Sequence, residues 1–119
     1  MQDFRDLKVW QKSHQLTLQI YQHTPNFPKE ELYGITSQIR RASSSIPTNI
    51  AEGCGREGGR DFARFLQIAM GSATEVVYLI FLCKDLQLLS SQIYEDLQIE
   101  TAQIKKMLAS FIKKLRSEN

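Results

Sequence analysis

The sequence contains few of the residues on which metal sites and redox enzymes depend. Its 119 residues include only two cysteines and two histidines. Cys54 and Cys83 form no CxxC pair and have no histidine at metal-ligand spacing, which argues against a zinc site and a disulfide framework. The sequence therefore predicts two reduced thiols in a cytoplasmic protein, with no metal and no cofactor.

Membrane-spanning segments and signal peptides are also missing from the pattern. The longest apolar run, Val76 to Cys83, is far shorter than the ~20 residues that cross a bilayer, and the first ten residues are charged. The net charge of +2 is too small to indicate nucleic-acid binding by itself. With 42% hydrophobic residues and only three prolines, the chain is expected to form one domain over residues 1–119, without a membrane contact.

Hydrophobic residues recur every three or four positions along four segments. This spacing predicts helices at Asp6–His23, Lys29–Glu52, Arg60–Leu86 and Ser91–Arg116. No segment shows the alternation of a strand and the connections are short, so the fold class is all-α, an antiparallel up-down-up-down four-helix bundle. The apolar faces of the first and third segments are much wider than the ~100° stripe of a surface helix, which predicts contact with further copies.

Pro47 and a group of glycines interrupt this helical pattern. Pro47 lacks the N–H group that would bond the carbonyl of Ser43, so we expect a bend there, softened by hydroxyls of the neighbouring serines. Gly53 and Gly55 are expected to end the second helix, because glycine adopts the left-handed conformation at little cost.

The segment Gly53–Gly58 also has the letters GxGxxG of a dinucleotide-binding turn. A nucleotide site is disfavoured because a helix precedes it where the motif needs a strand. The favoured interpretation is a turn between antiparallel helices. A third interpretation is a phosphate bound at the start of the next helix, beside Arg56, Arg60 and Arg64.

Positive charge is concentrated around this turn and in the helix before it, with five arginines between positions 40 and 64: Arg40, Arg41, Arg56, Arg60 and Arg64. Arg40 and Arg41 are expected to point about 100° apart on their helix, so at least one is exposed or lies at a subunit contact. Two interpretations stay open: solvated surface charge, or contact with phosphates of a nucleic acid.

No constellation of residues indicates catalysis. His14 and His23 have no Cys, Ser or carboxylate at suggestive spacing. Glu52 and Glu75 are the acidic residues on or near apolar faces, and each is expected to find a cationic partner, for Glu52 an arginine of the glycine-rich turn. We therefore predict no catalytic residue and no enzyme activity.

Three stretches resemble the bacterial four-helix-bundle proteins of the 23S rRNA intervening-sequence family. They are FRDLKVWQKS at Phe4–Ser13, FPKEELYGITSQIRRASSSIPTNIAEGCGR at Phe27–Arg56 and FARFLQIAMGSATE at Phe62–Glu75. The combination of YG-x-T-x-Q-x-RR-A with SIP-x-NIAEG is the specific part of the likeness. Departures are small: Ser44 and the pair Ala73-Thr74 stand where the family favours other residues.

The resemblance implies a ring of copies, a homopentamer. A related branch includes the accessory protein of diversity-generating retroelements. That protein resembles a barrel with a basic surface that engages reverse transcriptase and nucleic acid. The leading hypothesis is a non-catalytic module that binds RNA, or DNA, through the five arginines near the turn between the second and third helices. The alternative is a structural adaptor that recruits a protein partner, such as a reverse transcriptase, without binding nucleic acid itself.

Overall fold

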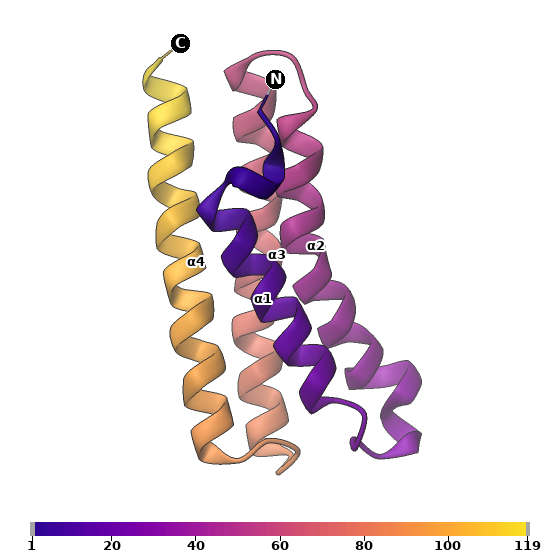
Figure 1. Ribbon diagram of the computed structural model, residues 1–119. Coiled ribbons are helices and arrows are strands. Elements are labelled where there is room, and N and C mark those ends of the chain that lie inside the picture. Colours follow the sequence, from indigo (N-terminus) through magenta and orange to yellow (C-terminus); the bar gives the residue numbers. More distant parts are fainter. Residues whose placement is uncertain (1, 119) are drawn as a thin grey trace.

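The computed structural model describes residues 2–118 and consists of helices and turns within that range. The helices are α1 (Lys8–His23), α2 (Ser37–Cys54), α3 (Gly59–Asp85) and α4 (Ser91–Ser117). They run alternately up and down as an elongated bundle of 46 × 23 × 20 Å, with α1 crossing obliquely over the others (Figure 1). The predicted all-α bundle and the bounds of its first, third and fourth helices are confirmed to within two residues.

The predicted beginning of the second helix at Lys29 is wrong. A 3₁₀ turn at Lys29–Glu31 and a π-helical turn at Leu32–Thr36 precede α2, and Gly34 leaves the helical conformation with φ −111° and ψ −117°. A wide turn of this kind lets the chain change direction after the two prolines, Pro25 and Pro28, before the regular hydrogen-bond ladder starts at Ser37.

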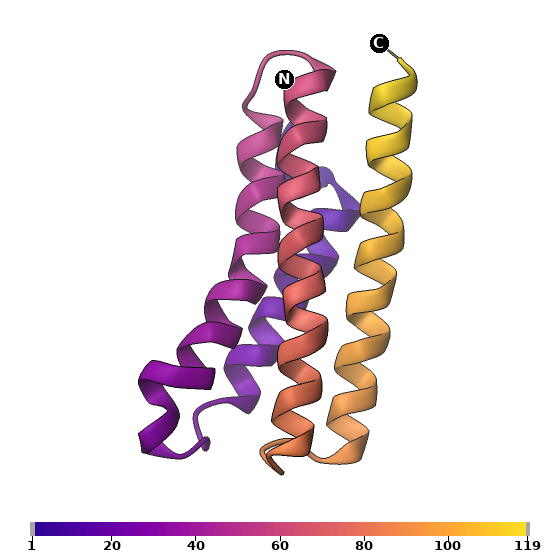
Figure 2. The ribbon, with the colours of Figure 1, turned by 180° about the vertical axis from the view of Figure 1, so that it is seen from behind.

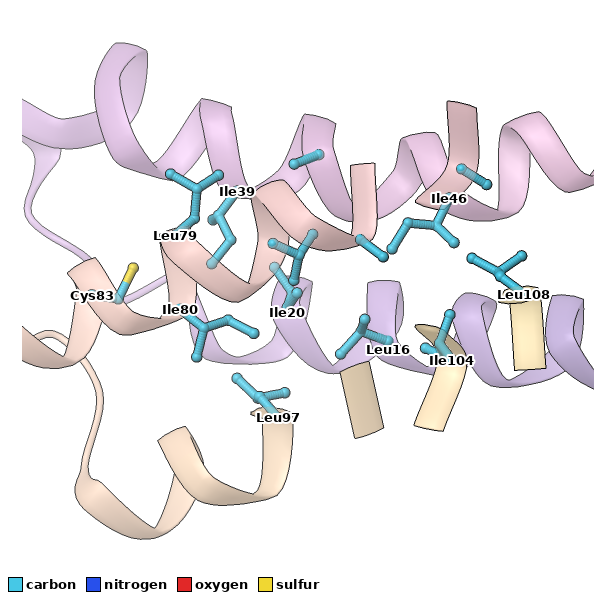
Figure 3. Packing of buried hydrophobic residues seen from close by; sticks show 14 of the residues in the cluster. Leu16, Ile20, Ile39, Ile46, Leu79, Ile80, Cys83, Leu97, Ile104 and Leu108 are labelled. Carbon is cyan, nitrogen blue, oxygen red and sulfur yellow. The ribbon is translucent and has the colours of Figure 1, made fainter. Parts of the chain in front are cut away.

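The core runs along the whole bundle and consists mostly of branched aliphatic side chains (Figure 3). Leu16 and Ile20 of α1 meet Ile39 and Ile46 of α2, while α3 and α4 supply Ile80, Leu97, Ile104 and Leu108, all at most 2% exposed. α3 is long and apolar enough to cross a membrane by length and composition. In the bundle it packs against both α2 and α4, and one of its faces belongs to the core.

Pro47 is accommodated inside α2 without ending it. The expected serine bonds are present, with Ser43 Oγ donating to the Arg40 carbonyl and Ser44 Oγ to the Arg41 carbonyl. A further donor comes from the neighbouring helix: Thr17 Oγ1 of α1 lies 3.0 Å from the Ser43 carbonyl oxygen, the acceptor that Pro47 leaves without its N–H partner. The carbonyl that Pro47 leaves without its N–H partner is therefore satisfied by a contact between helices.

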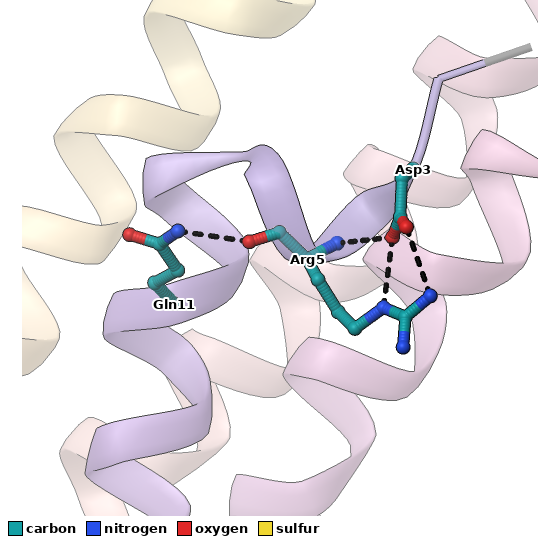
Figure 4. Close-up of polar contacts among 3 residues, drawn as sticks. All are labelled: Asp3, Arg5 and Gln11. Carbon is teal, nitrogen blue, oxygen red and sulfur yellow. Dashed lines mark hydrogen bonds and ion pairs between the residues drawn. The ribbon is translucent and has the colours of Figure 1, made fainter.

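The amino-terminal turn is fixed by one acidic side chain (Figure 4). Asp3 accepts from the backbone N–H of Arg5 at 2.9 Å and from the Arg5 guanidinium, while Gln11 Nε2 donates to the Arg5 carbonyl. The side-chain and backbone hydrogen bonds from Arg5 lower the pKa of Asp3 below its ordinary value. These contacts place Phe4 against Trp10, with ring centroids 4.9 Å apart, so the chain folds back over the start of α1.

Candidate nucleic-acid interface

The structure divides the five candidate arginines into two groups. Arg40 and Arg41 lie in the first half of α2, whereas Arg56, Arg60 and Arg64 surround the turn that joins α2 to α3. At 1.5 Å per residue, the sixteen positions from Arg40 to Arg56 correspond to about 24 Å. The arginines therefore do not form one continuous patch on a single molecule.

Arg40 and Arg41 point to different sides of α2, as the helical spacing predicts. Arg40 turns toward α1, where its Nε donates to Thr24 Oγ1 at 2.8 Å and its guanidinium lies 4.8 Å from the centre of the Tyr21 ring. Arg41 is exposed and lines a polar hollow between α2 and α3, together with Ser72 and Glu75. Arg40 thus connects two helices of the same chain, while Arg41 has no ion pair within residues 2–118.

The turn at the end of α2 depends on glycines in two different ways. Gly53 is buried, and a Cβ atom there would lie 2.7 Å from Phe62 Cδ1 and 3.0 Å from Phe65 Cβ, so close packing of α2 on α3 requires glycine. Gly58 has φ +85° and begins the path into α3. The prediction that Gly53 and Gly55 use the left-handed conformation is wrong: Gly55 has φ −83°, and the left-handed position is Gly58.

Arg56 and Arg64 are held on the two sides of this turn by carboxylates and by one aromatic ring. Arg56 Nη2 lies 3.2 Å from Glu52 Oε2, which confirms the predicted partner of Glu52, and Arg64 Nε lies 3.0 Å from Asp61 Oδ1. Both guanidinium groups lie over the Phe65 ring, at 4.7 and 4.6 Å from its centre. Their charges are therefore partly balanced within the chain, although both side chains keep exposed surface.

Arg60 is exposed and faces a hollow between the start of α3 and the end of α4. The hollow brings together Arg60, Arg64 and Arg116 with Glu57, Asp61 and Gln67. Neither Arg60 nor Arg116 forms an ion pair within the described residues. Sequence analysis missed Arg116 because it follows α3 by more than thirty residues, and only the packing of α4 beside α3 brings it there.

The other candidate groups do not gather into a reactive site. Cys54 and Cys83 are both buried and unpaired, and burial raises the pKa of the Cys83 thiol to about 11. His14 stacks on Trp10 with ring centroids 4.8 Å apart, as expected for a packed histidine. The predicted cationic partner of Glu75 is absent from residues 2–118, because Glu75 lies on the exposed side of α3, where water solvates it.

Comparisons with known proteins agree with the fold and with one family. A family model described as 23S rRNA-intervening sequence protein matches residues 5–110. A solved structure of a protein of unknown function, from the S23 ribosomal protein family of Bacteroides thetaiotaomicron, is similar with a TM-score of 0.81 and 27% sequence identity. That likeness covers 88% of this chain and 95% of the other. None of the curated proteins matches.

Proposed function

Because the chain belongs to the 23S rRNA-intervening sequence protein family, we propose that it is a non-catalytic helical bundle that binds RNA phosphates through arginines at the end of the bundle where α2 passes into α3. The observation that carries this proposal is the convergence of Arg60, Arg64 and Arg116 on one hollow. Guanidinium groups suit phosphate because their donors form a planar fork that bonds two oxygens at once.

The local balance of charge favours an anionic ligand. Three guanidinium groups line the hollow and two carboxylates, Glu57 and Asp61, oppose them. Asp61 is already bonded to Arg64, so Arg60 and Arg116 are the groups with unused donors. The first backbone N–H groups of α3 lie at the same end and add positive potential.

A single subunit offers few such contacts, so self-association belongs to the proposal. Five copies in a ring, the assembly that the family resemblance implies, present five equivalent hollows and let one RNA engage several of them. Linked contacts of this kind strengthen binding without any new interaction within a subunit. Light scattering on the purified protein tests the assembly, and a ring of five has a mass of about 69 kDa, from 13.7 kDa per chain.

Titration with a structured RNA at several salt concentrations tests the binding. The variant Arg60→Ala/Arg116→Ala removes two phosphate contacts per subunit. Each contact contributes about 0.7 to the slope of log K against log salt for a single strand and about 0.9 for a B-form duplex, so the slope falls by about 1.4–1.8 for each subunit that engages the RNA. Lys106→Ala/Lys113→Ala is the matched control, since it removes the same charge from exposed positions of α4 outside the hollow. Equal slopes for both variants would refute the assignment to the hollow.

Arg41 permits a second comparison. It lies in the separate hollow beside Ser72 and Glu75. If RNA follows the surface from the turn toward the middle of the bundle, Arg41→Ala lowers the affinity as well. An effect of Arg41→Ala without any effect of Arg60→Ala/Arg116→Ala would move the RNA site from the turn to the α2–α3 hollow.

A second candidate is the adaptor that recruits a protein partner, and one observation favours it. Tyr33 is 93% exposed in the π-helical turn and the adjacent Leu32 is 46% exposed, so both present apolar surface at the far end of the bundle from the arginine hollow. Aromatic residues of this kind often anchor protein interfaces. Tyr33→Ser should abolish capture of a purified reverse transcriptase while leaving the RNA salt slope unchanged. Unchanged capture would refute the adaptor role of this turn.

A further inference from the structure

A second hollow lies beside the arginine hollow of Arg60, Arg64 and Arg116. Figure 2 shows the α2–α3 turn and the end of α4, which enclose it, at the same end of the bundle. Its volume is about 660 Å³, within the roughly 300–1,000 Å³ of small-ligand sites. Glu57 lines both hollows, so they are neighbours. We name the second one the phenylalanine hollow; its lining includes Cys54, Arg56, Gly58, Phe62, Phe111 and Lys114.

Two aromatic rings form the apolar floor of the phenylalanine hollow. Phe62 of α3 and Phe111 of α4 are both half-buried, with ring centroids 5.1 Å apart and ring planes at 69°. Gly53 packs against Phe62, since a Cβ atom there would lie 2.7 Å from Phe62 Cδ1. Phe62 is therefore confined between a backbone and a second ring. Aromatic surface that is fixed in this way suits a flat ligand, because little side-chain freedom is lost on stacking.

The charges of the two hollows differ as the two parts of a nucleotide differ. In the arginine hollow, three guanidinium groups face two carboxylates, which leaves a positive surplus for a phosphate. In the phenylalanine hollow, Arg56 and Lys114 are matched by Glu57 and Glu118, so no net charge remains. A nucleobase has no net charge and offers a flat face for stacking, so its chemistry fits this second hollow.

Polar groups of the phenylalanine hollow can bond the edge of a base. Lys114 has no ion pair within residues 2–118, so its ammonium group is free to donate to a base carbonyl. Glu57 and Glu118 have no ion pair in that range either, and their carboxylates can accept from a base amino group. Arg56 is engaged by Glu52 at 3.2 Å and contributes charge with fewer free donors.

We propose that the phenylalanine hollow holds an unpaired base of the RNA whose phosphates lie at the arginine hollow; this inference rests on the function proposed above. A base inside a duplex is already stacked and paired, whereas a base in a loop or at a free end can be splayed out. The two hollows together therefore select single-stranded segments of an RNA. Phosphate contacts alone carry no information of this kind.

A strand without bases separates the base contribution from the phosphate contribution. A short single-stranded RNA is compared with an abasic strand of the same length, which keeps every phosphate. The natural chain should bind the intact strand about fivefold or more tightly, because stacking on an aromatic side chain is worth about 5- to 150-fold per base. The salt slope should be the same for both strands, since the phosphates set it. Equal affinities for the two strands overturn the inference.

Phe111→Leu assigns the base contribution to the phenylalanine hollow. Leucine keeps an apolar side chain against the core and removes the flat ring, so the preference for the intact strand should largely disappear. Phe111→Tyr keeps the ring and should retain the preference. Phe81→Leu is the matched control, because it makes the same change at a 47% exposed phenylalanine near the other end of α3. A preference that survives Phe111→Leu, or that Phe81→Leu lowers equally, overturns the assignment.

Fully paired RNA supplies a third comparison. A duplex has the phosphates of the single strand but offers no free base. Phe111→Leu should therefore leave the affinity for the duplex unchanged while weakening the binding of the single strand about fivefold or more. Equal weakening of both would show that the ring acts on the phosphate site, and the base site would be refuted.

The same measurements separate this inference from the proposed function. Arg60→Ala/Arg116→Ala should lower the salt slope for the intact and the abasic strand alike and leave the preference for the intact strand unchanged. A slope that falls as expected, without any preference for the intact strand, supports the phosphate site and refutes the base site. If neither strand binds, both the proposed function and this inference are wrong.

Discussion

Thr17 is expected to replace the hydrogen bond that Pro47 removes from α2, and this expectation can be tested by a double-mutant cycle. The Thr17 hydroxyl lies 3.0 Å from the Ser43 carbonyl and also 3.0 Å from the Ser13 carbonyl of its own helix. Ser13 already has the backbone N–H of Thr17 as a helical partner. The contact with Ser43 should therefore carry most of the energy of this hydroxyl.

Thr17→Val keeps the shape of the side chain and removes its donor. Thr17 and Ser43 are both buried, so the Ser43 carbonyl would lose its partner in a place that water does not reach. An unsatisfied buried acceptor costs about 1–3 kcal/mol. With a urea m value of about 2 kcal/mol/M for a domain of this size, the unfolding midpoint should fall by about 0.5–1.5 M.

Pro47→Ala supplies the second arm of the cycle. Alanine restores the backbone N–H that bonds the Ser43 carbonyl, so the hydroxyl of Thr17 becomes redundant. Any void left by the proline ring is present in both Pro47→Ala variants and cancels in the cycle. We expect Thr17→Val to be at least 1 kcal/mol less destabilising in the Pro47→Ala background than in the natural chain. Equal effects in both backgrounds would show that Thr17 does not serve the proline-freed carbonyl.

Three further predictions concern packing, capping and titration. Gly53→Ala should destabilise the fold by about 1–3 kcal/mol in chemical denaturation, because its Cβ would overlap the Phe62 ring at 2.7 Å; Gly55→Ala, which meets its nearest atom at 3.5 Å, is the control. Gln87→Gly should stabilise the fold by about 1 kcal/mol, because Gln87 adopts φ +63°, a conformation that glycine takes more easily. Gln87 lies at the end of α3, where its N–H bonds the Lys84 carbonyl and the N–H of Leu88 bonds the Cys83 carbonyl. A lower thermal midpoint for this variant would contradict the reasoning. Desolvation by burial, aided by the charge of Glu31, raises the pKa of the Cys83 thiol from 9.0 to about 11. As the pH rises, the thiol therefore ionises first in the unfolded chain. The part of the unfolding free energy that Cys83 contributes below pH 9 is lost as the pH approaches 11. This loss, about 2–3 kcal/mol at most, should disappear from the pH dependence of unfolding in Cys83→Ala.

The sequence determined most of the architecture because long amphipathic helices can be recognised from the local periodicity of their apolar residues. The bounds of α1, α3 and α4 follow from apolar residues repeated along one face, and Ser90 caps α4 by accepting from the Ile93 N–H. The start of α2 was misplaced because the π-helical turn around Gly34 has the same apolar spacing as a helix, and spacing does not report the backbone angles of one glycine.

For the candidate site, the sequence located the arginines around the α2–α3 turn and the Glu52–Arg56 pair, since these residues are near neighbours along the chain. Only the tertiary structure decided which arginines have unused donors. It brought Arg116 beside Arg60, placed Phe65 under both Arg56 and Arg64, and turned Arg40 toward Thr24.

The same distinction applies to the outward side of α3. The residues on this side of α3 recur at helical spacing in the sequence, but a helix wheel does not say which apolar side faces the core and which faces water. The packing of α2 and α4 settles this point by covering Leu66, Ala73 and Ile80 and leaving Gly71 and Tyr78 open. Local sequence therefore fixed where the helices form, because their hydrogen bonds are local. The choice of exposed and engaged charges required the packed bundle, because those contacts join residues far apart in the chain.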